Sequence, residues 1–443
     1  MEKDIELLLI IPSALDRQGN PVRHKKLLLP SITMPMLAAV TPAGVSITII
    51  YETIEDIPFG KKWDLVGISG MGSGSVRAWQ IADAFRENGV KTIIGGIGPS
   101  LFDPEMTLRH ADCIVIGEAE EIWGEVIEDF RSGRLQRIYR QERASDLSTL
   151  PTPRFDLMNM KKMGFMRSVQ ATRGCPYTCR FCSVSAFYHG AYRKRPVDKV
   201  IQDVRAAKKT GSRFVVFLDD NIFFDHEYNR ELWTALIPEK IIWISSATIH
   251  IADYPAMLEL AYKSGCRMLS VGIETLDKQN LKTVHKNWNH PGEYIRAVEI
   301  LRANHIMVSA SIMLGMDHDT KETFNHVFEF LMEGCVPIPR IMIITPIPGT
   351  PYFSELEKEN RIINHDFSKY TGGIVVFQPK NMNAEELEEG YWKMYSEVFT
   401  PKNIFRRMSK NITGQNPMII AGLFVTNFNY RKQIQKRVVP GIT

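Results

Sequence analysis

The chain has 443 residues, which is too long for one ordinary domain and sufficient for two or three. Hydrophobic residues make up 44% of it and charged residues 23%, a composition that excludes a disordered, collagen-like or coiled-coil protein. The formal net charge of +4 does not indicate a nucleic-acid partner, and we expect none.

The positive charge is concentrated at the carboxyl end of the chain. Residues 401–443 carry eight basic side chains and no acidic one, whereas the other 400 residues hold 46 basic and 50 acidic groups. An apolar stretch, 418–425, lies between the basic groups. This combination suits the surface of an anionic membrane, although a terminal helix that packs on the protein body would show the same pattern.

Targeting signals are absent from the part of the sequence where they would be expected. The acidic start, Met1–Asp4, does not resemble a signal peptide, and no apolar run reaches the ~20 residues of a spanning helix. Six cysteines are too few for a disulfide scaffold, and three of them fall within eight positions, which favours metal ligation. We expect a cytoplasmic protein, with peripheral contact to the inner face of the membrane through residues 401–443 as the alternative.

The first 135 residues alternate between strand-like and helix-like segments. Residues 76–88 have the apolar spacing of a helix. The apolar runs that predict strands are 6–11, 45–51, 65–69, 91–94 and 113–116. Such alternation predicts a Rossmann-like α/β domain over 1–135, with ligands bound at the carboxyl ends of its parallel strands.

A second series of strands and helices follows a proline-containing stretch, 136–165, which predicts a linker. The expected strands of this series are 168–172, 214–218, 241–245, 268–271, 306–313 and 341–344. Six strands with crossovers predict a partial (β/α)6 barrel over 166–351, with its chemistry at the strand carboxyl ends. An α/β extension, 352–400, and the basic, partly apolar tail, 401–443, complete the expected small C-terminal region.

One segment, 173–182, carries the most specific motif of the chain. Cys175, Cys179 and Cys182 are spaced C-x3-C-x2-C. Three thiolates on one short loop can bind three irons of a [4Fe–4S] cubane and leave the fourth iron open to a small molecule. A zinc site would need further ligands, and the sequence offers only His189 nearby; inert thiols are the remaining interpretation.

The cysteine motif resembles that of the radical S-adenosylmethionine (SAM) superfamily, with Phe181 at its aromatic position. The resemblance implies that the open iron binds SAM and that an electron from the cluster, delivered by a flavodoxin or ferredoxin, cleaves it. The 5′-deoxyadenosyl radical then takes hydrogen from the substrate. Metal ligands would be Cys175, Cys179 and Cys182.

Later strand ends resemble the cofactor-binding turns of the same superfamily. The residues that the resemblance places against SAM are Phe181, Asp219, Asp220, Ser246, Glu274, Met313 and Met316. A helix cap would equally explain the two aspartates, and a surface position would explain Glu274. No substrate-contacting catalytic residue is identified by the resemblance.

The layout of the first 135 residues resembles the cobalamin-binding domain that precedes the barrel in one large subgroup. The residues that would face cobalamin are Ser69, Gly95, Gly96, Gly117 and Glu118. The motif D-x-H-x-x-G, whose histidine binds cobalt, is absent. The domain therefore either holds cobalamin without a protein ligand to cobalt or serves as a lid, and the missing histidine favours the lid.

The subgroup includes anaerobic magnesium-protoporphyrin monomethyl ester cyclase-like enzymes and enzymes that modify bacteriochlorophylls and hopanoids. The resemblance implies hydrogen abstraction from an unactivated carbon of a large apolar small molecule, a tetrapyrrole or an isoprenoid lipid. The missing histidine favours oxidation, hydroxylation or cyclisation, with cobalamin-dependent C-methylation as the alternative. Two other classes stay open: a non-catalytic iron–sulfur relay or sensor, and tRNA modification, which the acidic body of the protein disfavours.

Overall fold

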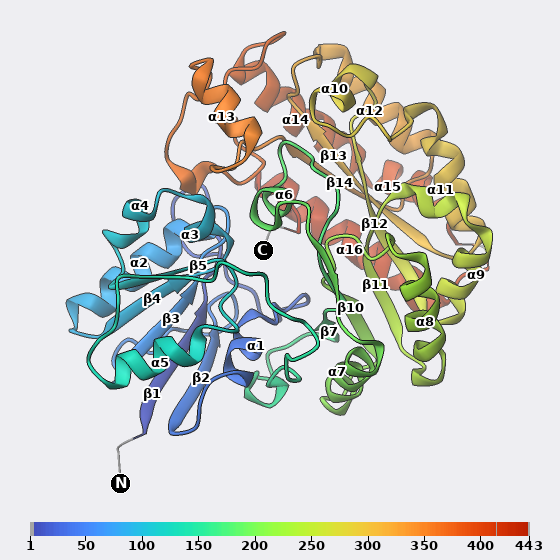
Figure 1. Cartoon of the computed structure of the whole chain (residues 1–443). Helices are drawn as coiled ribbons and strands as arrows, with labels where there is room; N and C mark the ends of the chain where they lie inside the picture. The colour runs from blue at the N-terminus through green and yellow to red at the C-terminus, as the bar shows by residue number, and fades with distance from the viewer. Residues whose placement is uncertain (1–3, 413, 442–443) are drawn as a thin grey trace.

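In the computed structural model, which describes residues 4–412 and 414–441, two six-stranded parallel sheets stand beside each other (Figure 1). The strands of the first sheet, in spatial order, are β2 (Val45–Tyr51), β1 (Ile5–Ile11), β3 (Leu65–Ser69), β4 (Lys91–Gly95), β5 (Cys113–Ile116) and β6 (Ile138–Arg140). The helices of this half are α1 (Thr33–Ala39), α2 (Gly74–Glu87), α3 (Ile97–Leu101), α4 (Pro104–Leu108) and α5 (Trp123–Arg131).

The second sheet forms the barrel-like half of the molecule. Its strands, in spatial order, are β14 (Ile338–Ile343), β13 (Met307–Leu314), β12 (Cys266–Glu274), β11 (Ile242–Ala247), β10 (Phe214–Phe217) and β7 (Met166–Val169). Between β7 and β10 lies a short antiparallel pair, β8 (Thr172–Gly174) and β9 (Tyr192–Lys194). The helices are α6 (Ser183–Tyr188), α7 (Val197–Lys209), α8 (His226–Leu236), α9 (Pro255–Lys263), α10 (Lys278–Thr283), α11 (Tyr294–Ala303) and α12 (Lys321–Glu333).

Four helices follow the barrel: α13 (Pro351–Lys358), α14 (Ala384–Val398), α15 (Pro401–Ser409) and α16 (Pro417–Gln435). The expected fold class is thus confirmed: an N-terminal Rossmann-like sheet, a second parallel sheet with the six strands expected of the partial barrel, and a helical C-terminus. Within residues 4–412 and 414–441, no helix combines the length and the apolar character needed to cross a membrane.

Hydrophobic patterning explains why these segments form their elements. In β1, the four consecutive residues 7–10 are fully buried, as expected for a central parallel strand covered on both faces. In α2, the buried residues Ala78, Ile81, Ala82 and Phe85 follow the helical spacing and face the sheet. The pairings within both sheets are parallel, so each sheet gathers the carboxyl ends of its strands at one edge.

The structure differs from the sequence expectations at three places. The strand expected at 168–172 is divided, because the chain turns between Val169, where β7 ends, and Thr172, where β8 begins. The expected linker, 136–165, begins with β6, which pairs with β5 and extends the first sheet. Instead of a strand, the expected α/β extension at 352–400 contains a single bridge between Ile362 and Phe377, which connects the region of α13 to that of α14.

Candidate active site

The three clustered cysteines lie in the loop between β8 and α6. The residue before the first of them, Gly174, has a φ of +85°, and a Cβ atom there would lie 2.1 Å from the carbonyl oxygen of Ala191. Only glycine fits this close approach of β8 to the turn before β9. Gly174 therefore allows the backbone to turn from β8 into the cysteine loop while it stays close to Ala191.

Two aspartates after β10 hold the backbone that leads into this loop. The carboxylate of Asp219, 3% exposed, accepts hydrogen bonds from the N–H of Ala171 at 3.2 Å and from the N–H and hydroxyl of Thr172, each at 2.5 Å. Asp220 accepts one from the N–H of Gly174 at 2.9 Å. Burial raises the pKa of Asp219 to about 7 and also raises the pKa of Asp220. Both residues thus position the backbone that leads into the cysteine loop.

The far side of the loop is fixed through Arg180. Its N–H donates to the carbonyl of Val284 at 3.2 Å, and its carbonyl accepts from the N–H of Tyr352 at 3.0 Å. Its guanidinium forms an ion pair with Glu355 of α13 at 2.7 Å. The loop is therefore held from β10, from the segment after α10 and from α13.

The thiols of the loop are sheltered from solvent and close to one another. Cys179 is 9% exposed, and Cys175 and Cys182 are half-buried. Burial is the main reason that the pKa of the Cys175 thiol is raised to about 11 and that of Cys179 to about 12; Cys182 adds to this rise, and the ammonium of Lys286 opposes it. The thiols of Cys175 and Cys179 therefore lie within electrostatic reach of Cys182 and of the positive charge of Lys286.

The thiols of Cys175, Cys179 and Cys182 are the candidate metal donors of this loop. Among the described residues, no group of three or more His, Cys, Asp or Glu side chains is arranged to hold one metal ion. A cubane does not require the three thiolates to meet at one metal ion, because each thiolate binds a different iron. The loop therefore has the donor set for three corners of a [4Fe–4S] cluster.

Glu274, expected to contact SAM, lies at the end of β12 in a strained conformation. Its φ is +64°, in the left-handed region, a state that costs a non-glycine residue about 1–3 kcal/mol and is common at functional sites. Its carboxylate is 2.5 Å from the ammonium of Lys286, which also donates to the carbonyl of Gly272 at 2.9 Å. Lys286 is therefore a site residue that the sequence analysis missed, since no motif surrounds it.

Of the remaining residues expected near SAM, all but Phe181 lie at strand ends. Ser246 is the second-last residue of β11. Met313 is buried near the end of β13, and Met316 is buried just after it. Phe181 is half-buried against the main core. A further residue, Asn221, follows β10 and is 3% exposed, yet neither its amide nitrogen nor its amide oxygen has a hydrogen-bond partner within the described residues. Such an orphaned amide fits a polar ligand at this edge of the sheet.

The first sheet has its own open edge. The order β2-β1-β3-β4-β5 is that of a doubly wound sheet whose ligand crevice lies between the ends of β1 and β3. Ser69 ends β3, and in the turn after it Met71 is 67% exposed while a Cβ on Gly72 or Gly74 would meet no atom within 4 Å. This open turn fits a large ligand at the crevice.

The three glycines expected near cobalamin lie beside this turn at the ends of β4 and β5. Gly95 ends β4, and Gly96 follows it with a φ of +106°; a Cβ on Gly96 would lie 2.8 Å from the carbonyl of Gly70. Gly117 follows β5 with a φ of +88°. Both positive φ values require glycine for the tight turns, whether or not a ligand is bound.

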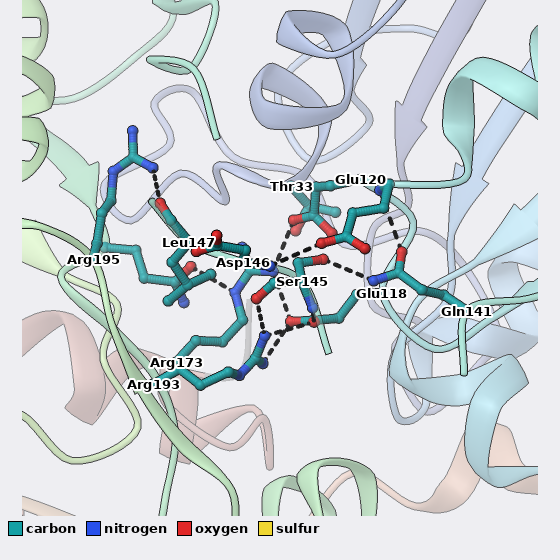
Figure 2. A network of polar contacts seen from close by, with 12 residues as sticks. Thr33, Glu118, Glu120, Gln141, Ser145, Asp146, Leu147, Arg173, Arg193 and Arg195 are labelled. Atoms are coloured by element: carbon teal, nitrogen blue, oxygen red, sulfur yellow. Dashed lines mark hydrogen bonds and ion pairs between the residues drawn. The ribbon is translucent and has the colours of Figure 1, made fainter. Parts of the chain in front are cut away.

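Glu118, the fifth residue expected near cobalamin, belongs instead to a buried ionic network (Figure 2). Its carboxylate binds Arg173 at 2.7 Å, Arg193 at 2.8 Å and the N–H of Ser145 at 2.6 Å, and Arg173 also binds Glu120 at 2.8 Å. Burial would raise the pKa of Glu118, but the two guanidinium groups and the N–H lower it to about 2. A cobalamin contact by Glu118 would have to compete with these partners.

The network shows how the two sheets meet. Glu118 follows β5 of the first sheet, and Arg173 stands two positions before Cys175. Nearby, α3 contacts α6, and a Cβ on Gly349, after β14, would lie 2.6 Å from the carbonyl of Leu101 in α3. All of these segments follow carboxyl ends of strands, so both sheets direct those ends toward one interface, with the cysteine loop inside it (Figure 1).

Comparisons with known proteins agree with this architecture. Residues 169–331 match the family described as the Radical SAM superfamily, and residues 350–432 match a domain of unknown function, DUF4070. The chain is 29% identical over 391 residues to bacteriochlorophyllide d C-12(1)-methyltransferase of Chlorobaculum tepidum. This match covers 85% of each of the two chains. The chain is 25% identical over 345 residues to anaerobic magnesium-protoporphyrin IX monomethyl ester cyclase of Cereibacter sphaeroides, which covers 71% of this chain and 56% of that one.

A solved structure extends the likeness to the whole fold. The radical SAM methyltransferase TsrM of Kitasatospora setae, with cobalamin and a [4Fe–4S] cluster bound, superposes with a TM-score of 0.71. The superposition covers 97% of this chain and 99% of TsrM, at 15% sequence identity. The shared fold includes both sheets.

Alanine at any one of Cys175, Cys179 and Cys182 is expected to remove most of the iron bound after anaerobic reconstitution, because two thiolates leave the cluster with two unprotected corners. Release of 5′-deoxyadenosine from SAM should stop as well. Iron and sulfide analysis measures the first effect. The matched control is Cys266→Ala, a buried thiol at the start of β12; equal iron loss in that variant would contradict the assignment.

Glu118→Gln is expected to lower the free energy of unfolding by about 3 kcal/mol, since it leaves buried guanidinium charge uncompensated. The folded pKa of about 2 lies below the unfolded value of 4.5, so the stabilisation is complete above about pH 4.5 and lost as the pH falls toward 2. Denaturant unfolding should therefore give the same difference at about pH 7 and about pH 5. The exposed Glu125→Gln is the control, expected within about 0.5 kcal/mol of the parent; a similarly small effect of Glu118→Gln would show that the network is not stabilising.

Proposed function

We propose that this radical SAM enzyme is a cobalamin-dependent C-methyltransferase that acts on an unactivated carbon of a tetrapyrrole. Its radical SAM domain implies a [4Fe–4S] cluster and SAM as cofactors. The observation that carries the proposal is the extent of the likeness to the bacteriochlorophyllide methyltransferase, which reaches 85% of both chains and is therefore too long to be confined to the barrel and the helices after it.

This proposal reverses the preference drawn from the sequence alone. There, the missing D-x-H-x-x-G histidine favours oxidation, hydroxylation or cyclisation. The loss of that histidine removes one ligand to cobalt, but the crevice between β1 and β3 and the open turn around Gly72 do not depend on it. The relatives therefore support methylation better than they support the oxidative outcome.

Residues at the carboxyl ends of the strands in the two sheets would bind different cofactors. When bound, cobalamin supplies a transferable methyl group, and the cluster with SAM supplies the one-electron chemistry that activates the substrate carbon. Cys175, Cys179 and Cys182 would hold the cluster, and Asn221 with the Glu274–Lys286 pair would orient the polar groups of SAM. The turn 70–74 would hold cobalamin. Contact between α3 and α6 would keep water away from the radical.

Aromatic side chains beside the cysteine loop support a flat, apolar substrate. The ring of Tyr177 stacks on that of Trp288 at 4.2 Å between centroids. Phe224 is 44% exposed. The centroid of its ring lies 6.3 Å from that of Tyr177 and 5.0 Å from that of Tyr192. Rings in this arrangement offer a broad apolar surface of the kind that binds planar macrocycles.

A second candidate function is oxidative ring closure on a tetrapyrrole. The likeness to the magnesium-protoporphyrin cyclase favours it, but it reaches only 56% of that longer protein. The two functions differ in their products: methylation adds a carbon to the substrate, whereas oxidation only removes hydrogen or adds oxygen.

The protein reconstituted anaerobically with iron, sulfide and cobalamin is expected to transfer a deuterated methyl group from SAM to a bacteriochlorophyllide in the presence of reduced flavodoxin. Mass spectrometry should find the complete CD3 group in the product, on a carbon. A matched reaction without cobalamin should give no methylated product. A substrate that loses hydrogen or gains oxygen without a methyl group would contradict methylation and support the oxidative alternative. An intact cluster that never cleaves SAM would favour a relay or sensor.

A further inference from the structure

We propose that α15 and α16 form a surface that binds the face of an anionic lipid membrane. This surface, here called the apolar–basic face, consists of exposed side chains of residues 402–412 and 414–436. It plays no part in the proposed methyl transfer, and its evidence is independent of that function.

The apolar part of the face consists of four exposed side chains from α15, α16 and the segment between them. The side chains of Phe405, Met418 and Val425 are 58%, 61% and 61% exposed, and Ile412 between the helices is 49% exposed. Met418 and Val425 are seven residues apart and therefore lie on the same side of α16. The ring of Phe405 is 5.2 Å from that of Phe424, which joins the two helices into one surface.

The basic part of the face has no acidic counterpart. Residues 401–443 contain no aspartate or glutamate. Three of their basic groups are buried or bound within the protein: Arg407 is buried, Arg431 donates to the carbonyl of Phe399, and Arg437 pairs with Glu389. The other five are exposed and form no ion pair within the described residues: Lys402, Arg406, Lys410, Lys432 and Lys436.

Helical geometry places the charges beside the apolar groups. On α15, Lys402 and Arg406 flank Phe405 at the i, i+3 and i+4 positions of one face. On α16, Lys432 follows Val425 by seven residues on the same side. Long basic side chains around inserted apolar groups match an anionic headgroup layer over acyl chains. Each cation gains from the negative surface potential, so the charge complementarity favours lipid over an uncharged protein partner.

The opposite side of the two helices is fixed to the barrel. The guanidinium of Arg407 donates to the carbonyls of Val336 and Pro337 at 2.8 and 3.1 Å and to Asn427 of α16 at 2.9 Å. Those carbonyls precede β14, at the amino end of the strand, whereas the cysteine loop lies among the carboxyl ends. The face is therefore a fixed part of the fold, and it can attach the protein to a membrane without covering the site.

Co-sedimentation of the full-length protein with vesicles tests this inference. We expect binding to vesicles of phosphatidylcholine mixed with phosphatidylglycerol, weakened by added salt, and no binding to pure phosphatidylcholine. The triple variants Phe405→Ser/Met418→Ser/Val425→Ser and Lys402→Glu/Arg406→Glu/Lys432→Glu should each lose more than about tenfold in affinity. The control variant Ile363→Ser/Lys209→Glu, which changes one exposed apolar and one exposed basic residue elsewhere, should bind like the parent.

Thermal unfolding and iron content establish that the variants are folded, since both should match those of the parent. Equal binding of the parent and the triple variants to anionic vesicles would overturn the inference, as would failure of the parent to bind them. A dimer in size-exclusion chromatography that only the serine variant loses, without lipid binding by the parent, would assign the face to a second copy of the chain instead.

Discussion

A buried carboxylate shared by two guanidinium groups determines how the two sheets meet. Glu118 comes from the end of β5, while Arg173 and Arg193 belong to β8 and β9 on either side of the cysteine loop. Most of the surface of each charged side chain is removed from water, so the network is favourable only when all its members are in place. The position of the first sheet is thereby tied to the backbone that carries Cys175. This coupling matters for any chemistry that must pass between ligands held on the two edges.

Contacts from several elements organise the cysteine loop. Asp219 and Asp220 hold its start, Arg180 holds its far side, and the strained Glu274 with Lys286 stands beside the thiols. Strain and buried charge both cost stability, and they persist here because the surrounding strands fix the geometry. A site of this kind needs little rearrangement to receive its ligands, which suits an enzyme that must keep a radical away from water.

Much of this arrangement can be predicted from the sequence, because the signals are local. The cysteine spacing identifies the loop directly, and apolar runs locate the strands of both sheets, except β6, to within a few residues. The contacts that assemble the site are not local. Arg173 and Glu118 are 55 positions apart, and Lys286 stands in a polar loop that no pattern distinguishes from other surface segments. The missing cobalt-binding histidine also biased the functional expectation, since a single side chain says little about a crevice built from backbone turns.

Electron paramagnetic resonance of the reduced protein, prepared anaerobically and measured with and without SAM, tests the central claim most directly. If Cys175, Cys179 and Cys182 hold a [4Fe–4S] cluster with one open iron, the reduced protein gives a cluster signal whose g values change when the amino and carboxylate groups of SAM bind that iron. Protein without a cluster signal, or a signal that saturating SAM leaves unchanged, would contradict the account.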